Sequence, residues 1–431
     1  MPSPTIVIIG AGFAGIQAAK GLRRADANIA LIDRHNYHLF QPLLYQVATA
    51  GLSPADIAFP IRRIFRSQKN VSVAMGEVAR VDLAQNRVHF NGDESLGYDY
   101  LVIAAGATHS YFGKDHWQPF APGLKTIDDA TEIRKRVLIA FEEAEYEADE
   151  ASRRAKLTFV VVGGGPTGVE MAGALREIAA QEIQKDFRHI DTTTSRIMLL
   201  QSGDRLLPSM HESLSAQAKH DLEKMGVIVR LNSRVTDVDA TGLWIGEERL
   251  DCQNMIWAAG VQGAPVNHTL GVELDRSGRV QVMPDLSVPG FPNAFVVGDA
   301  ASVMNIKTQQ PVPGQAPAAM QMGRYVAKII STELSARIDA PPRPPFEYKD
   351  KGSLATIGTA RAVADIKGWR FTGFIAWLFW CFIHVSFLIS FRSKLFVMFG
   401  WFYDYIFNSR EARLITGKTD FKVHTPRLPE R

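Results

Sequence analysis

The sequence predicts an α/β fold with two similar domains and a helical C-terminal segment. Two observations predict the paired domains: a glycine pattern occurs twice, and each copy is followed at nearly the same distance by an Ala-Ala-Gly turn. A third observation, a long apolar run near residue 380, predicts the C-terminal segment. The chain has 431 residues, more than one ordinary core accommodates, so two or three domains are expected.

The glycine pattern is GxGxxG, placed each time between an apolar run and a helix rich in small residues. The first copy has Gly10, Gly12 and Gly15, and the second has Gly163, Gly165 and Gly168. In such a pattern the first glycine permits a tight turn, the second lets the backbone approach a pyrophosphate, and the third lets helix and strand pack closely. The placement therefore predicts two Rossmann-like dinucleotide-binding domains.

An acidic residue is expected at the end of the next strand, where it would bind a ribose. In the first copy NIALID ends in Asp33, which follows Gly10 by 23 positions. In the second copy the matching position is Gln201. A neutral Gln can hydrogen-bond a 2′-hydroxyl but does not repel a 2′-phosphate, so use of NADPH beside NADH stays open.

Two further landmarks set the predicted domain boundaries. Gly106 and Gly260 each end an Ala-Ala-Gly turn, and the strand FVV runs into Gly298-Asp299 after the second unit. An aspartate there could bind the ribityl hydroxyls of a flavin, or could simply cap a helix. The predicted boundaries are 1–118 with 293–345 for a discontinuous first domain that keeps a flavin, 119–292 for a nicotinamide domain, and 346–431 for the C-terminal region.

Composition excludes several classes of protein. Lys and Arg number 48 against 45 Asp and Glu, so the net charge of +3 gives no support for a nucleic-acid binder. The two cysteines, Cys252 and Cys381, are far apart, which excludes a zinc ribbon or a disulfide scaffold, and no metal site is predicted. The first residues lead straight into a strand, so we expect the folded body to stay in the cytoplasm.

The segment 371–391 contains no Asp, Glu, Lys or Arg and is rich in Trp and Phe. Its length suits a transmembrane helix, its aromatic content suits helices lying in the membrane interface, and a buried core helix is a third alternative. Arg370, Arg392 and Lys394 flank the segment, where they could contact lipid phosphates. His384 stands alone in the run and is expected to serve packing rather than chemistry.

The three landmarks, in this order, resemble the glutathione-reductase-like flavoprotein superfamily with two dinucleotide-binding domains. The stretches QPLLYQVA, APGLKTIDDATEIR and GSLATIGTARAVA, with FRSK and RLITG near the end, narrow this resemblance. Together they look like type II NADH:quinone oxidoreductase, the non-pumping respiratory dehydrogenase, over essentially the whole chain. The fold alone does not name the electron acceptor.

The resemblance implies a set of site residues. FAD would be bound by Gly10, Gly12, Ala14, Gly15, Asp33, Val78, Ala105, Gly298, Asp299 and Ala316, with Pro42 and Gln46 beside its ring. NADH would be bound by Gly163, Gly165, Thr167, Gly168, Glu170, Gln201, Ala259 and Gly260. The catalytic candidates are Glu170, Gln46 and Gln321.

Two positions depart from the family pattern, and one residue has two interpretations. The family commonly has an acid where this chain has Gln201, and a glutamine where this chain has Pro317. Glu170 is expected in the first turn of its helix. There it could orient the nicotinamide for hydride transfer, or could only complement the helix dipole.

The expected activity is FAD-dependent transfer of a hydride from NADH and then of two electrons to a membrane quinone, without proton pumping. The expected partners are this quinone, a bilayer surface and a second copy of the chain. The resemblance implies that the chain is held monotopically on the cytoplasmic face of the inner membrane, with a single transmembrane helix as the alternative. The missing cysteines exclude a disulfide reductase and a sulfide:quinone oxidoreductase. A reductase with a soluble ferredoxin-like or rubredoxin-like acceptor remains an alternative, as does a non-enzymatic NADH sensor docked at a membrane.

Overall fold

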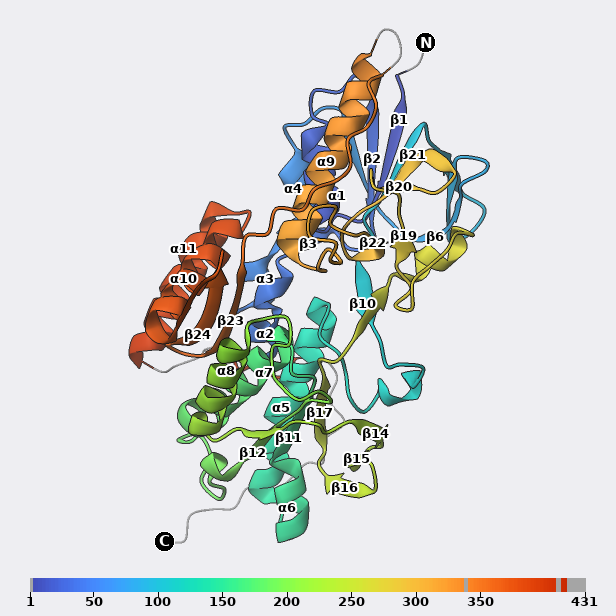
Figure 1. The fold of residues 1–431 in the computed structure, drawn as a ribbon. Coiled ribbons are helices and arrows are strands. Elements are labelled where there is room, and N and C mark those ends of the chain that lie inside the picture. Colours follow the sequence, from blue (N-terminus) through green and yellow to red (C-terminus); the bar gives the residue numbers. More distant parts are fainter. Residues whose placement is uncertain (1–2, 337–339, 408–411, 417–431) are drawn as a thin grey trace. The chain divides into compact units, whose positions relative to one another are not determined.

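The computed structural model describes residues 3–336, 340–407 and 412–416, which fall into two compact units (Figure 1). Unit 1 comprises Met1–Leu39, Ala58–Thr108 and Val261–Lys351, and unit 2 comprises Phe40–Ile57, His109–Gly260 and Gly352–Arg431.

Unit 1 is built on a six-stranded sheet with the order β20-β21-β9-β1-β2-β5. Its strands are β1 (Thr5–Ile9), β2 (Asn28–Asp33), β5 (Val71–Met75), β9 (Tyr100–Ile103), β20 (Ser287–Val288) and β21 (Phe291–Val296). All neighbouring pairs are parallel except β20 with β21. Four residues of β1 are buried, as expected for a central parallel strand with both faces covered.

Two helices of unit 1, α1 (Phe13–Gly21) and α9 (Ala316–Ser335), pack on each other (Figure 1). Gly323 permits this contact, because a Cβ there would lie 2.2 Å from the carbonyl oxygen of Ala14. The smaller elements of unit 1 are α4 (Ile61–Phe65), β3 (Tyr37–Leu39), β4 (Ala58–Pro60), β6 (Val78–Asp82), β7 (Arg87–Phe90), β8 (Ser95–Gly97), β18 (Val261–Gly263), β19 (Val280–Gln281), β22 (Ala301–Ser302), η5 (Pro265–Thr269) and η6 (Gly298–Ala300). Strand β10 (Ala107–His109) lies where the chain passes into unit 2.

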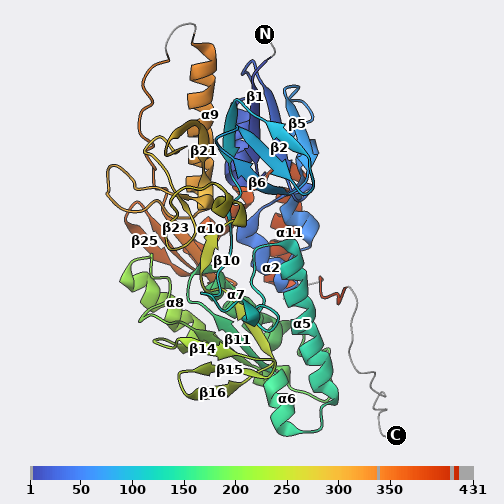
Figure 2. The ribbon, with the colours of Figure 1, turned by 90° about the vertical axis from the view of Figure 1, so that its right-hand side faces the viewer.

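Unit 2 repeats this plan with a parallel sheet in the order β13-β12-β11-β17. The strands are β11 (Thr158–Val162), β12 (Arg196–Leu200), β13 (Ile228–Arg230) and β17 (Asn254–Trp257), and the antiparallel strands β14 (Val235–Val238), β15 (Gly242–Ile245) and β16 (Glu248–Asp251) form a separate ribbon (Figure 2). The α-helices are α2 (Leu44–Ala48), α3 (Pro54–Ile57), α5 (Ile127–Tyr146), α6 (Glu150–Lys156), α7 (Pro166–Glu177) and α8 (Glu212–Met225). The short 3-10 helices are η1 (Gln41–Leu43), η2 (Asp115–Trp117) and η4 (Thr192–Thr194), and η3 (Ile178–Glu182) is a π-helical continuation of α7.

The C-terminal part of unit 2 packs on α7 and α8. It consists of the antiparallel strands β23 (Ser353–Gly358), β24 (Arg361–Ile366) and β25 (Trp369–Thr372), then α10 (Gly373–Phe387) and α11 (Phe391–Phe407). Figure 1 shows the two helices beside β24, and α10 contacts that strand. Small residues of α7 permit the packing, because a Cβ on Gly173 would lie 1.7 Å from the carbonyl oxygen of Ile357.

The observed units differ from the predicted domain boundaries. Residues 40–57 and 352–431 group with the second nucleotide unit, and residues 261–292 group with the first. The physical reason is contact within unit 2: α2 packs on α5 and α7, while β23 packs on α7. Sequence order alone does not reveal such packing.

The apolar run 371–391 is not one continuous helix. Strand β25 ends at Thr372, α10 ends at Phe387, and α11 begins at Phe391. Within the described residues, no helix combines the length and the apolarity needed to cross a bilayer.

Candidate functional site

The glycine loop between β1 and α1 has the geometry of a pyrophosphate site. Gly10 has φ +98°, and a Cβ there would lie 2.3 Å from the carbonyl oxygen of Ala104, so no other residue fits. At Gly12, in contrast, no heavy atom lies within 4 Å of the point that a Cβ would occupy. Gly12 is also the N-cap of α1 and provides no side-chain cap, so the first N–H groups of that helix can bind a phosphate.

Two side chains hold this loop. Asp33, at the end of β2, accepts hydrogen bonds from the N–H of Ala11 at 2.7 Å and of His35 at 2.8 Å. The Nδ1 of His38 donates to the carbonyl oxygen of Ala11 at 2.9 Å. The sequence pattern identified Asp33 but not His38, which belongs to no motif and lies on strand β3.

The second loop, between β11 and α7, repeats the same geometry. Gly163 has φ +117°, and a Cβ there would lie 2.6 Å from the carbonyl oxygen of Ala258. The space around Gly165, the N-cap of α7, is open to 4 Å. Gln201 accepts a hydrogen bond from the N–H of Gly164 at 2.9 Å, as Asp33 does in the first loop. The two residues are therefore structural equivalents.

The remaining candidates of unit 1 lie on several elements. Ala105 follows β9 beside Gly10, Gly298 approaches the side chain of Ala14, and Asp299 lies next to Gly314. Val78 begins β6, and Ala316 begins α9. Gln321, on α9, pairs with the backbone of Lys349 in both directions at 3.0 Å. This pairing gives Gln321 a structural role in joining α9 to the following segment.

The remaining candidates of unit 2 lie on three helices and after one strand. Thr167, Gly168 and Glu170 belong to α7, Ala259 and Gly260 follow β17, and Pro42 and Gln46 belong to η1 and α2. The ring of Phe112 lies beside Gly260, 2.6 Å from the point a Cβ would occupy. Phe112 is 70% exposed with φ +53°, and no sequence pattern predicted its place near the end of β17.

Glu170 differs from the expectation for its position. It is the fifth residue of α7, and the first turn of that helix has no acidic residue, so the helix-dipole explanation is wrong. Its side chain is buried, and burial raises the pKa of Glu170 to about 8, against smaller lowering effects from the backbone of Thr356 and the side chain of Trp380. Glu170 is therefore largely protonated at neutral pH.

A pocket within unit 2 joins Glu170 to the C-terminal helices. Glu170 and Glu177 of α7, Tyr45 and Gln46 of α2, and Thr356 of β23 contribute to its wall. The aromatic residues of the wall come from α10 and α11 and are Trp377, Trp380, Trp401 and Tyr405. The pocket thus combines a protonated carboxyl group, an amide and an aromatic wall.

Trp380 is the centre of an aromatic cluster in this wall. Its ring is fully buried and lies 4.1 Å from His384, 5.2 Å from Trp401 and 6.5 Å from Tyr45, measured between centroids. His384 donates from Nδ1 to the carbonyl oxygen of Trp380 at 2.7 Å. Burial lowers the pKa of His384 to about 4, so the ring is neutral and serves packing, as expected from the sequence.

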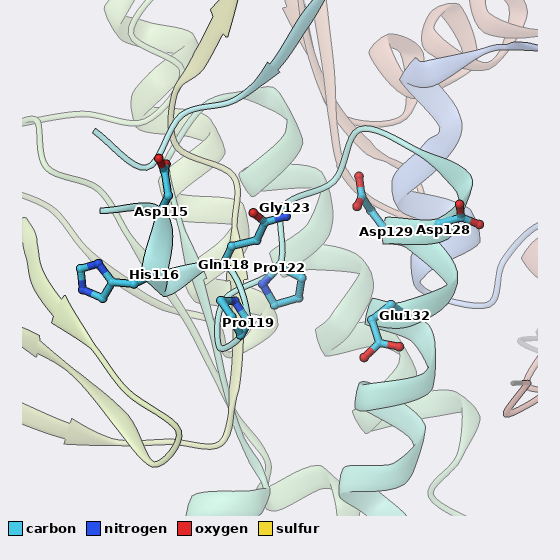
Figure 3. Close-up of a pocket in the computed structure, with 9 residues that line it drawn as sticks. All are labelled: Asp115, His116, Gln118, Pro119, Pro122, Gly123, Asp128, Asp129 and Glu132. Carbon is cyan, nitrogen blue, oxygen red and sulfur yellow. The ribbon is translucent and has the colours of Figure 1, made fainter. Parts of the chain in front are cut away.

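A second hollow, of about 500 Å³, lies between η2 and the start of α5 (Figure 3). It is acidic, with Asp115, Asp128, Asp129 and Glu132 along its wall. Asp129 caps α5 by accepting from the N–H of Thr126, and it also contacts His109 at 3.2 Å. Asp129 in this hollow thus has a structural role as the capping residue of α5. The side chains suited to catalysis lie instead in the pocket of Glu170.

Two glycine loops of this geometry define the flavoprotein oxidoreductases with two dinucleotide-binding domains. Residues 4–323 match the family described as pyridine nucleotide-disulphide oxidoreductase, and residues 351–410 match the NDH2 C-terminal domain. The chain is 46% identical to the type II NADH:quinone oxidoreductase Ndh of Mycobacterium tuberculosis, over 96% of this chain and 91% of that protein. The chain belongs to the type II NADH:quinone oxidoreductase family.

Two further comparisons agree with this assignment. NdhA of the same organism, also named a type II NADH:quinone oxidoreductase, is 45% identical over 96% of this chain and 89% of its own length. The solved structure of NDH2 from Plasmodium falciparum in complex with NADH has a TM-score of 0.85 at 21% identity, covering 96% of this chain and all of that one. The predicted fold class and family are thus confirmed.

Replacing Glu170 by Gln should change how stability depends on pH. The folded chain holds a proton on Glu170 up to about pH 8, whereas an unfolded chain releases it near 4.5. The free energy of unfolding should therefore fall between these pH values, by up to about 4 kcal/mol, and the neutral amide should remove this loss. Urea unfolding at pH 5, 7 and 8.5 measures the effect.

Glu247→Gln, at an exposed position, is the matched control and should keep the wild-type slope. Parallel pH curves for wild type and Glu170→Gln would show that Glu170 ionises with an ordinary pKa.

Proposed function

We propose that this chain oxidises NADH and reduces a membrane quinone by way of a bound FAD. The observation that carries the proposal is the architecture of α7. Its N-terminus forms the second dinucleotide loop at Gly165, and its second turn carries Glu170 into a pocket walled by the aromatic C-terminal helices. One helix thus joins a site for a water-soluble donor to a site for an apolar acceptor.

FAD fits the loop of unit 1, and its bound isoalloxazine ring supplies the hydride-accepting and electron-donating chemistry. The open space at Gly12 and the uncapped N-terminus of α1 suit its pyrophosphate. Asp33 would accept a hydrogen bond from the adenosine ribose while it keeps its bond to Ala11. Asp299, in the turn next to Gly298, would hold the ribityl chain.

NADH fits the loop of unit 2 in the same way. Gly165 leaves room for the pyrophosphate, and Gln201 would hydrogen-bond the ribose hydroxyls through its amide N–H₂ while its oxygen accepts from Gly164. Ala259 and Gly260, at the end of β17, would lie near the nicotinamide half, with Phe112 beside them.

The acceptor would bind in the pocket of Glu170. Reduction of a quinone to a quinol takes up two protons, and a protonated carboxyl group with a pKa of about 8 is suited to deliver one of them at neutral pH. Gln46 would donate a hydrogen bond to a quinone carbonyl, since its amide also lies in the wall of the pocket. We therefore propose that Glu170 acts in the acceptor step rather than in orienting the nicotinamide.

The outward faces of α10 and α11 would rest on the bilayer. Phe382, Phe391, Phe399 and Phe402 are each more than 60% exposed, which is costly in water and favourable at a membrane interface. We place this surface on the cytoplasmic face of the inner membrane, where NADH is available. The quinone would then enter the pocket from the lipid side.

The proposed function is tested by separating the two half-reactions in detergent-purified protein. The wild type should oxidise NADH only slowly alone and rapidly with a short-chain quinone. Glu170→Gln should leave flavin reduction by NADH nearly unchanged in stopped-flow and slow quinone-dependent reoxidation by roughly 100-fold or more, the effect of losing a positioned proton donor. A wild type that does not reduce quinone disproves the proposal. Slower flavin reduction in Glu170→Gln would indicate that Glu170 acts on the nicotinamide instead.

Nucleotide choice should depend on Gln201. The wild type should oxidise NADPH measurably, because a neutral amide does not repel a 2′-phosphate. Gln201→Glu keeps an oxygen for Gly164 but adds a negative charge, so the KM for NADPH should rise by roughly 10-fold or more while that for NADH changes less. If the wild type excludes NADPH as completely as Gln201→Glu does, Gln201 does not set the preference.

Attachment to the membrane should depend on apolar contacts rather than on charge. The double variant Phe399→Glu with Phe402→Glu should sediment with lipid vesicles at least 10-fold less, because each buried Phe contributes about 2 kcal/mol. The wild type should stay bound in 0.5 M salt, since screening barely weakens apolar contact. Met75→Glu, at an exposed apolar site of unit 1, is the control and should bind normally. Release of the wild type by salt would indicate electrostatic attachment.

A further inference from the structure

A chain of two hydrogen bonds connects α11 to the pocket wall. The indole Nε1 of Trp401 donates to Oε1 of Gln46 at 2.7 Å, and Nε2 of Gln46 donates to the hydroxyl oxygen of Tyr45 at 2.9 Å. Gln46 and Trp401 are 355 positions apart, so only the folding of unit 2 brings them together. All three side chains line the pocket of Glu170.

The indole fixes which way the amide of Gln46 points. An indole N–H can only donate, so the amide atom that faces it has to be the oxygen. The N–H₂ group is thereby turned to the opposite side, where it reaches Tyr45. One of its two hydrogens makes that bond, and among the described residues the other makes none. An amide held this way offers a donor, rather than an acceptor, to a ligand in the pocket.

Trp401 is held in place by the helix that bears the exposed aromatic face. Along α11, Val397 is fully buried, and Trp401 follows it by one turn on the same side. Phe399 and Phe402, on the other side, are 64% and 63% exposed. The ring of Trp401 also lies 5.2 Å from that of the buried Trp380. The inward side of α11 therefore presents the indole N–H to Gln46 in a defined direction.

We propose that Trp401 is a positioning residue for the electron acceptor. By holding Oε1 of Gln46, it turns the amide N–H₂ toward the pocket, where it donates to a carbonyl oxygen of the acceptor. A quinone has two carbonyl oxygens, which are hydrogen-bond acceptors, so it needs a donor at this position. The proposal rests on the proposed function and adds the group that orients its acceptor site.

Without the indole N–H, the amide of Gln46 can turn over. Its oxygen would then face Tyr45 or the pocket, and an oxygen opposite a quinone carbonyl repels it. Trp401→Phe removes the N–H and keeps an aromatic ring in the wall. The expected result is a rise in the KM for a short-chain quinone of roughly 3- to 10-fold, the effect of one hydrogen bond.

The test compares this variant with others in full-length, detergent-purified protein. Flavin reduction by NADH and turnover with ferricyanide, which does not need a hydrogen-bonded site, should be unchanged in Trp401→Phe. Trp369→Phe, at an 80% exposed position on β25, is the matched control and should behave as wild type. Gln46→Glu keeps an oxygen for Trp401 but removes the N–H₂ group, so it should raise the quinone KM without lowering the melting temperature.

A double-mutant cycle separates positioning from a general structural effect. If Trp401 acts through Gln46, adding Trp401→Phe to Gln46→Leu should leave the quinone KM as it is in Gln46→Leu alone. The positioning role is overturned if the quinone KM is unchanged in Trp401→Phe, or if the effects of the two substitutions on this KM multiply. Neither outcome contradicts quinone reduction itself. A wild type that reduces ferricyanide but no quinone overturns both proposals.

Discussion

The close approach of backbone to backbone at the two glycine loops is the constraint on which the rest of this molecule depends. At Gly10 and Gly163 the chain passes so near the end of a neighbouring strand that a single methyl group would overlap a carbonyl oxygen. The following helix therefore starts at the sheet edge with its N–H groups uncapped. Asp33 and Gln201 then accept hydrogen bonds from equivalent N–H groups in the two loops. The two units therefore stabilise their loops by the same backbone and side-chain contacts.

The same kind of close approach shapes the pocket of Glu170. Gly173 lets β23 lie against α7, and this contact brings the backbone of Thr356 to the buried carboxyl group of Glu170. Burial then raises the pKa of Glu170, because few charges nearby compensate for the lost hydration. A small residue in a helix thus leads, through packing, to a protonated acid in the wall of an aromatic pocket.

The C-terminal helices serve two purposes at once. Their exposed phenylalanines form an apolar face, while their inward tryptophans complete the wall around Glu170 and Gln46. The sequence of 371–391 does not reveal this division, because aromatic residues occupy both sides of the helices. The run is divided between β25, α10 and α11, and the break at Leu388 lets α11 fold back onto α10.

The sequence by itself determined the α/β class, the two glycine loops with Asp33 and Gln201, and the apolar C-terminal segment. These features are local, because strand, turn and helix starts are specified by residues within a few positions of each other. The tertiary structure alone decided that residues 40–57 and 352–431 join the second unit, that Glu170 is buried in the second turn of α7, and that Trp401 bonds Gln46. Gln321, a catalytic candidate from the sequence, pairs with the backbone of Lys349, a contact that no local pattern predicted. Burial, pKa and hydrogen bonds between residues hundreds of positions apart depend on packing, which no local pattern encodes.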